Sequence, residues 1–157
     1  ALWRLEAYDA SRRVLDLLPP AQRQDAMYLV VRGMVLRRLP AYEPEAEQCF
    51  RRVIALDPDR SDAYYNLANL LLDRQAFEQA EPLFRHCLGL DPTGSLAWHN
   101  YGIAFNGLQR FAEATPVLQT SLRLEPGSAD AWCNLGLAYF GADRFEPAQR
   151  AFAVAIK

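Results

Sequence analysis

The chain has 157 residues, of which 51% are hydrophobic and 23% are charged, and its formal net charge at pH 7 is −2. This hydrophobic content is enough for a substantial core. The nearly balanced charge argues against a nucleic-acid-binding protein, because such proteins usually carry a strong basic excess. No apolar run reaches the length of a membrane span and no signal-like segment opens the chain, so we expect no direct membrane insertion.

The first predicted element is an amphipathic helix over residues 2–18. Leu5, Val14 and Leu18 are among its apolar positions, and arginines occupy the positions left for solvent. Pro19 is expected to end this helix, because proline removes a backbone donor and disrupts a helix interior. The irregular connection that follows, residues 19–25, is the longest in the chain.

A less regular pair of helices is predicted over residues 26–60. We place its first helix from about Asp25 to Arg38. Cys49 lies in this segment, and Cys87 and Cys133 lie further along the chain. Because the three cysteines are odd in number and irregularly spaced, we expect buried free thiols. Free thiols favour a reducing compartment, and cytoplasmic is therefore the predicted location, with the periplasm left open.

The remainder of the chain repeats at a step of 34 residues. The segments 61–94, 95–128 and 129–157 each read as two helices joined by a short polar turn. Four columns keep this step: Tyr64, Trp98 and Trp132; Asn66, Asn100 and Asn134; Phe77, Phe111 and Phe145; Ala80, Ala114 and Ala148. A compositional accident does not keep phase across so many columns.

The last repeat carries the pattern W-x2-L-G-x2-Y…A-x3-F, formed by Trp132, Leu135, Gly136, Tyr139, Ala148 and Phe152. The chain therefore resembles the tetratricopeptide repeat family over nearly its whole length. This resemblance implies an all-α fold, a right-handed α-solenoid of antiparallel helix pairs with about nine helices. Arg32 departs from the pattern, because it occupies the position of Leu135, where the family has leucine. We call this position the leucine column.

The resemblance also implies one array over residues 1–157. Its parts are the second helix of a truncated repeat (1–19), repeat 1 (26–60), repeat 2 (61–94), repeat 3 (95–128) and a truncated repeat 4 (129–157). Small residues such as Gly102 and Gly136 are expected to let the two helices of a repeat approach closely.

Family geometry implies that the first helix of each repeat lines a concave groove. The candidate peptide-binding residues are Asn66, Asn100, Asn134, Tyr65, Asn69, Asp73, His99, Ile103, Asn106, Leu137, Phe140, Arg37 and Arg38. The asparagine column is similar to that of the O-linked N-acetylglucosamine transferase superhelix. A side-chain amide both donates and accepts, so it can pair with the backbone of any extended peptide. The alternative is that asparagine is simply a common solvated choice in this column.

Other sites of the family fit less well. Chaperone-binding members hold a terminal carboxylate with basic side chains, whereas this chain has Tyr65, Asp130 and Asn134 at those positions. Without cations the charge-assisted hydrogen bonds are missing. No catalytic triad, phosphate-binding loop or metal-ligand spacing is present, so we expect no enzyme activity, no cofactor and no metal.

The predicted function is a protein–protein interaction module that binds an extended peptide or protein segment in its groove. One alternative is a substrate-recruiting arm of a larger enzyme, such as a glycosyltransferase. Another is a structural scaffold that self-associates through an uncapped apolar C-terminal end containing Phe152 and Ile156.

Overall fold

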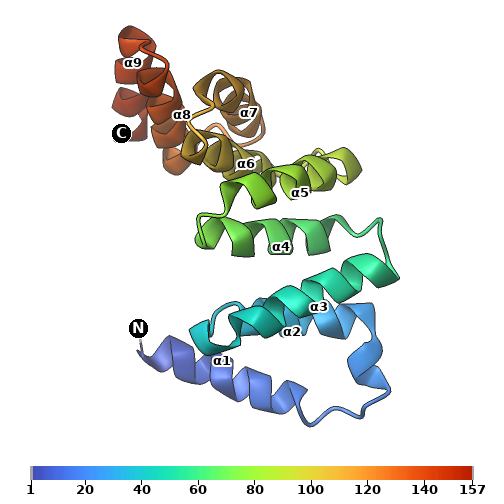
Figure 1. Cartoon of the computed structure of the whole chain (residues 1–157). Coiled ribbons are helices and arrows are strands. Elements are labelled where there is room, and N and C mark those ends of the chain that lie inside the picture. Colours follow the sequence, from blue (N-terminus) through green and yellow to red (C-terminus); the bar gives the residue numbers. More distant parts are fainter. Residues whose placement is uncertain (1, 157) are drawn as a thin grey trace. The chain divides into compact units, whose positions relative to one another are not determined.

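The computed structural model describes residues 2–156, and all regular structure in that range is helical (Figure 1). The α-helices are α1 (Leu2–Leu15), α2 (Ala26–Leu36), α3 (Glu43–Leu56), α4 (Ser61–Asp73), α5 (Phe77–Leu90), α6 (Ser95–Gly107), α7 (Phe111–Leu124), α8 (Ala129–Gly141) and α9 (Phe145–Ala155). Two short 3-10 helices, η1 (Gln22–Gln24) and η2 (Pro40–Tyr42), lie before α2 and α3. The prediction of an all-helical fold with about nine helices is confirmed for these residues.

The helix starts follow the sequence repeat. The first helices α4, α6 and α8 begin at Ser61, Ser95 and Ala129, a constant step of 34 residues. Contacts divide the chain into two compact units, Ala1–Leu70 and Leu71–Lys157, with the division inside α4. Each unit has its own packing, and the single array of repeats stays a prediction.

The first unit packs α1 on α2 and α2 on α3. Val30, Val53 and Ala63 form a buried cluster. Phe50, which precedes Val53 by one turn of α3, is also fully buried. Asp25 caps α2, because its side chain accepts from the backbone N–H groups of Met27 and Tyr28. The cap confirms the predicted start of this helix. The helix ends at Leu36, two residues before the predicted end at Arg38.

The first helix is shorter than the sequence suggests. It ends at Leu15, before the predicted end at Leu18. The guanidinium of Arg23 donates to the backbone carbonyl oxygens of Leu18, at 2.7 Å, and Asp16. These bonds satisfy carbonyl groups at the end of the helix, where no intrahelical donor is available.

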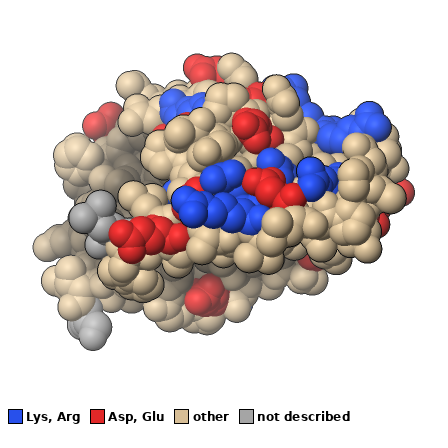
Figure 2. Space-filling model, turned by 90° about the horizontal axis from the view of Figure 1, so that it is seen from below, with Lys and Arg blue, Asp and Glu red and all other residues tan. Residues whose placement is uncertain are grey.

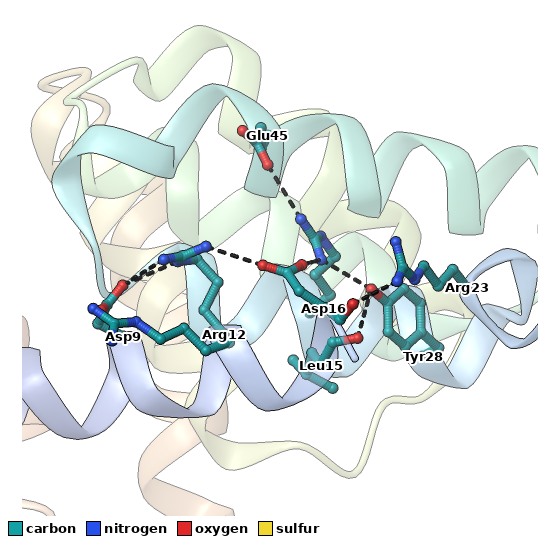
Figure 3. A network of polar contacts seen from close by, with 9 residues as sticks. Asp9, Arg12, Leu15, Asp16, Arg23, Tyr28 and Glu45 are labelled. Carbon is teal, nitrogen blue, oxygen red and sulfur yellow. Dashed lines mark hydrogen bonds and ion pairs between the residues drawn. The ribbon is translucent and has the colours of Figure 1, made fainter. Parts of the chain in front are cut away.

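Arg32, the residue in the leucine column, joins three helices of the first unit. Its guanidinium bonds to Asp16, the residue after the end of α1, and to the hydroxyl of Tyr28 in α2, and it pairs with Glu45 of α3 at 3.5 Å. Figure 3 shows the adjoining contacts, in which Arg12 lies between Asp9 and Asp16. A polar residue fits the leucine column here because the carboxylate of Asp16, just after α1, lies within reach of it. The hydrogen bond from Arg32 lowers the pKa of Asp16.

The second unit packs each helix from α5 to α9 on the next. A Cβ atom built on Gly102 would lie 2.4 Å from Cγ of Leu118, and one built on Gly136 would lie 2.5 Å from Cε1 of Phe152. No real Cβ atom approaches so closely. The expected role of small residues in helix approach is therefore confirmed at both positions.

The turn between the two helices of a repeat is also periodic. Gln75, Gln109 and Asp143 have φ of 58°, 57° and 57°. This left-handed conformation favours glycine, which has no Cβ to clash with the backbone. Non-glycine residues occupy the position in all three repeats, so each turn holds some local strain.

Candidate functional site

The second unit brings three predicted site residues together between α6 and α8. Nδ2 of Asn106 donates to the backbone carbonyl of Asn134 at 3.0 Å, which links the two helices directly. Nε2 of His99 lies 3.0 Å from Nδ2 of Asn134. The side chain of Asn134 is therefore placed by contacts from the preceding repeat.

The hydrogen bonds of Asn134 fix the orientation of its amide. Nδ2 also donates to the backbone carbonyl of Asp130 at 2.9 Å. Since Nδ2 can only donate, Nε2 of His99 must accept, and the imidazole is neutral with its proton on Nδ1. Both amide hydrogens are engaged inside the protein, which leaves Oδ1 as the atom that Asn134 offers to a partner.

Burial supports the neutral form of His99. Its side chain is only 8% exposed. Burial lowers the pKa of His99 below its usual value. The carboxylate and the backbone carbonyl of Asp130 and the carboxylate of Glu125 only partly oppose this effect. His99 is thus a support for the Asn134 amide, more than an exposed contact residue.

Apolar side chains lie near these amides in the helix sequence. Leu137 is 47% exposed and Phe140 is 58% exposed, while Ile103 is half-buried. The ring of Phe140 meets the ring of Phe145 edge to face, with 5.6 Å between centroids. Exposed side chains of this size next to polar groups are typical of a contact surface.

Five other predicted residues lie in α4 and α6. Asn66 repeats the local contact of Asn134, because its Nδ2 donates to the carbonyl of Asp62 at 2.8 Å. Asn66 and Asn69 are buried, Tyr65 and Asn100 are half-buried, and Asp73 is exposed. These residues differ in exposure although they were predicted as one set.

Arg37 and Arg38 lie at the end of α2. Arg37 is the C-cap residue and is half-buried, whereas Arg38 is exposed. The NH1 atom of Arg37 is buried and has no hydrogen-bond partner. A buried guanidinium nitrogen without a partner is costly to the folded protein.

One hollow lies outside all the predicted site residues. It has a volume of about 710 Å³ and is lined by α7, α8 and α9, with Arg123, Arg144 and Arg150 among its residues. Comparison with the preceding repeat would have revealed it, because Gly89, Glu113 and Pro116 stand 34 residues before Arg123, Pro147 and Arg150. The sequence prediction was limited to the positions that line the concave groove of the family, and none of those positions lines this hollow.

The described residues contain no group of three or more metal-ligating side chains. None of the three cysteines forms a disulfide; Cys49 and Cys87 are buried as predicted, but Cys133 is exposed. The prediction of burial was wrong for Cys133, which stands one helical turn before Leu137 on the same exposed side of α8. Within residues 2–156 no helix is both long enough and apolar enough to cross a membrane.

Charge is mixed on the face seen in Figure 2. Arginine side chains lie next to aspartate and glutamate side chains, and neither sign covers that face alone. Several ion pairs of the described residues join neighbours on one helix, such as Arg51 with Glu47 at 2.7 Å. A surface of this kind has no extended field for a polyanion.

Comparison with known proteins agrees with the helical fold. The profile of the family described as tetratricopeptide repeat matches residues 44–95 and 102–157. No curated protein matches the chain. Among solved structures, MamA from Desulfovibrio magneticus RS-1 (41-end) superposes with a TM-score of 0.87 and 21% identity, covering 98% of this chain and 86% of that chain. MamA MSR-1 superposes with a TM-score of 0.83 and 21% identity, covering 98% of this chain and 87% of that chain. At such low identity these likenesses establish the fold.

Proposed function

Because this chain belongs to the tetratricopeptide repeat family, we propose that its helical hairpins act by holding a segment of another protein. The chain is a protein-interaction module. We assign the contact to a surface of the second unit, the α6–α8 face, formed by Asn100, Ile103, Asn134, Leu137 and Phe140. The amide of Asn134, fixed by Asp130 and His99, is the observation that carries this assignment.

A fixed amide suits an extended peptide. Oδ1 of Asn134 can accept a hydrogen bond from a backbone N–H, a group that every residue except proline carries. Because the amide is already held in place, binding costs little of its side-chain entropy. The exposed areas of Leu137 and Phe140 supply apolar contact for side chains of the same segment. The asparagine column thus provides affinity that does not depend on the sequence bound.

A matched pair of leucines provides the test. Leu137 is 47% exposed on the α6–α8 face, and Leu124 is 46% exposed at the end of α7. Peptides are selected on the native protein from a random display library, and their affinities are measured by fluorescence anisotropy. We expect Leu137→Ala to weaken binding about tenfold, which is common for a central contact residue. Leu124→Ala should leave the affinity within about twofold. Equal effects of the two variants would contradict the assignment.

Self-association is a second candidate, favoured by an apolar hollow on α9. This hollow has a volume of about 590 Å³ and includes Phe145, Phe152 and Ile156, and Ile156 is 88% exposed. An exposed apolar surface of this kind favours contact with another molecule. Sedimentation of the Phe145→Ser/Ile156→Ser variant tests the candidate. A native protein that is already monomeric at high concentration would remove it.

We propose that this segment is not catalytic and that it works in the cytoplasm. The groups on the α6–α8 face are amides and apolar side chains, which suit binding. Cys49, Cys87 and Cys133 form no disulfide, and Cys133 is exposed, which supports a reducing compartment.

A further inference from the structure

The hollow lined by α7, α8 and α9 lies on a different side of α8 from the α6–α8 face. Trp132, Leu135 and Tyr139 line the hollow, whereas Leu137 and Phe140 do not line it. Leu122 and Val154 extend its apolar floor from the neighbouring helices. We call this hollow the arginine groove, because Arg123, Arg144 and Arg150 also line it.

Arg144 is held in place by an aromatic ring. Its guanidinium carbon lies 4.8 Å from the ring centroid of Tyr139. The hydroxyl of Tyr139 in turn accepts from Nε2 of Gln119 of α7 at 2.9 Å. The guanidinium is therefore positioned before any ligand arrives, which lowers the entropy cost of binding.

The preceding repeat shows the same stack with one added partner. Arg110 lies 4.7 Å over the ring of Phe105, and it also bonds to both carboxylate oxygens of Glu113. The residue 34 positions after Glu113 is Pro147. Arg144 therefore keeps the stack but has lost the carboxylate that pairs with Arg110.

The other two arginines are additions to the repeat pattern. Arg123 and Arg150 stand where the preceding repeat has Gly89 and Pro116. Arg123 donates to the neutral hydroxyl of Thr120 at 2.9 Å, and both arginines are exposed. No aspartate or glutamate is among the residues that line the groove. Three cations surround one apolar floor in a protein whose net charge is −2.

We infer that the arginine groove docks an acidic segment of a partner protein, in which carboxylates pair with Arg123, Arg144 and Arg150 and an apolar side chain contacts Leu135 and Val154. Charge complementarity carries the inference. Arginine binds carboxylate in a planar, two-point geometry. Carboxylates of the partner would restore to Arg144 the pairing that Arg110 has within the chain.

A protein segment fits the groove better than a nucleic acid. Bases bind proteins without sequence preference by stacking on free aromatic faces. One face of Tyr139 is covered by Arg144 and is not available to a base. The apolar floor instead offers contact for an aliphatic side chain.

Two labelled peptides test the inference on the native protein by fluorescence anisotropy. The first probe has the sequence DELDELDE, and the second, NQLNQLNQ, has the same shape without the charges. We expect the acidic probe to bind at least about tenfold more tightly, and its binding to weaken as salt increases. Equal binding of the two probes, or binding of neither, would overturn the proposal.

A matched pair of variants locates the binding. Arg123→Gln/Arg150→Gln removes two cations from the groove, and Arg4→Gln/Arg52→Gln removes two exposed cations from the first unit. We expect the first variant to lose at least about tenfold in affinity for DELDELDE, and the second to lose less than about threefold. Equal losses would show a general charge effect and overturn the proposal.

Two further measurements distinguish an acidic protein segment from other occupants of the arginine groove. A short single-stranded oligothymidylate that binds with the same arginine dependence, in place of DELDELDE, would assign the groove to nucleic acid. Sedimentation that shows a dimer of the native protein and a monomer of Arg123→Gln/Arg150→Gln would assign it to a second copy. Either result overturns the proposal. Leu137→Ala should leave DELDELDE binding unchanged, so failure of the groove is distinguishable from failure of the α6–α8 face.

Discussion

Nε2 of His99 accepts a hydrogen bond from Nδ2 of Asn134 across 3.0 Å, so a histidine of one repeat orients an asparagine of the next. Asp130 accepts from the same amide nitrogen. The arrangement requires an imidazole without a proton on Nε2. Protonation of His99 would place a second donor against the amide and force it to turn, which breaks the bond to Asp130.

This contact predicts a loss of stability in acid. The usual pKa of histidine is 6.5, and burial lowers that of His99 in the folded protein. As the pH falls below 6.5, the unfolded chain binds the proton first, so the free energy of unfolding decreases until the pH passes the folded pKa. Urea denaturation over this range measures the decrease. His99→Gln should remove much of it, whereas His86→Gln, at an exposed position, should retain it.

The left-handed turns predict stabilisation by glycine. Gln109 has φ of 57°, a conformation that costs a residue with a Cβ about 1 kcal/mol. Gln109→Gly should therefore raise the free energy of unfolding by up to about 1 kcal/mol. Gln149→Gly, inside α9, should lower it by about 1 kcal/mol, because glycine is unfavourable in a helix. Chemical denaturation of both variants checks the opposite signs.

The close helix approach predicts opposite effects for two helical glycines. A Cβ on Gly102 would meet Leu118 at 2.4 Å, whereas one on Gly89 would meet nothing within 4 Å. We expect Gly102→Ala to destabilise the protein by about 1–3 kcal/mol through overpacking. Gly89→Ala should stabilise it by about 0.5–1 kcal/mol. Thermal unfolding distinguishes them, and a similar change in both variants would show that the helices are not tightly packed at Gly102.

The polar contacts of Arg32 predict that the family residue is unfavourable at this position. Arg32→Leu matches the leucine column but removes one of the two arginines that pair with Asp16, leaving only Arg12. Because Asp16 is partly exposed, the expected cost is about 1–2 kcal/mol. Arg52→Leu, at an exposed position, should cost little. If Arg32→Leu is at least as stable as the native protein by urea denaturation, the network has no stabilising role.

The repeat step predicted the helices well because it depends on local sequence. Ser61, Ser95 and Ala129 begin helices where the 34-residue period placed them, and Gly102 and Gly136 lie in close contacts as expected. Such features follow from residue size and from periodic position, which the sequence states directly.

The side-chain contacts were less predictable. The period placed Asn134 on a contact surface, but it did not show that Asp130 and His99 already engage both amide hydrogens. The period also marked Arg32 as a departure from the family's leucine, but it did not show that the carboxylates of Asp16 and Glu45 pair with this arginine. These contacts join different helices and depend on side-chain conformations that a repeat pattern does not contain.

The most direct test of the α6–α8 face is an NMR titration with a peptide selected on the native protein. The side-chain amide signals of Asn100 and Asn134 and the methyl signals of Leu137 and Ile103 are followed as the peptide is added. We predict that these signals shift together and saturate at one concentration. Shifts confined to Val154 and the other residues of the arginine groove, with the Asn134 amide unchanged, would contradict the proposal that this face holds the partner.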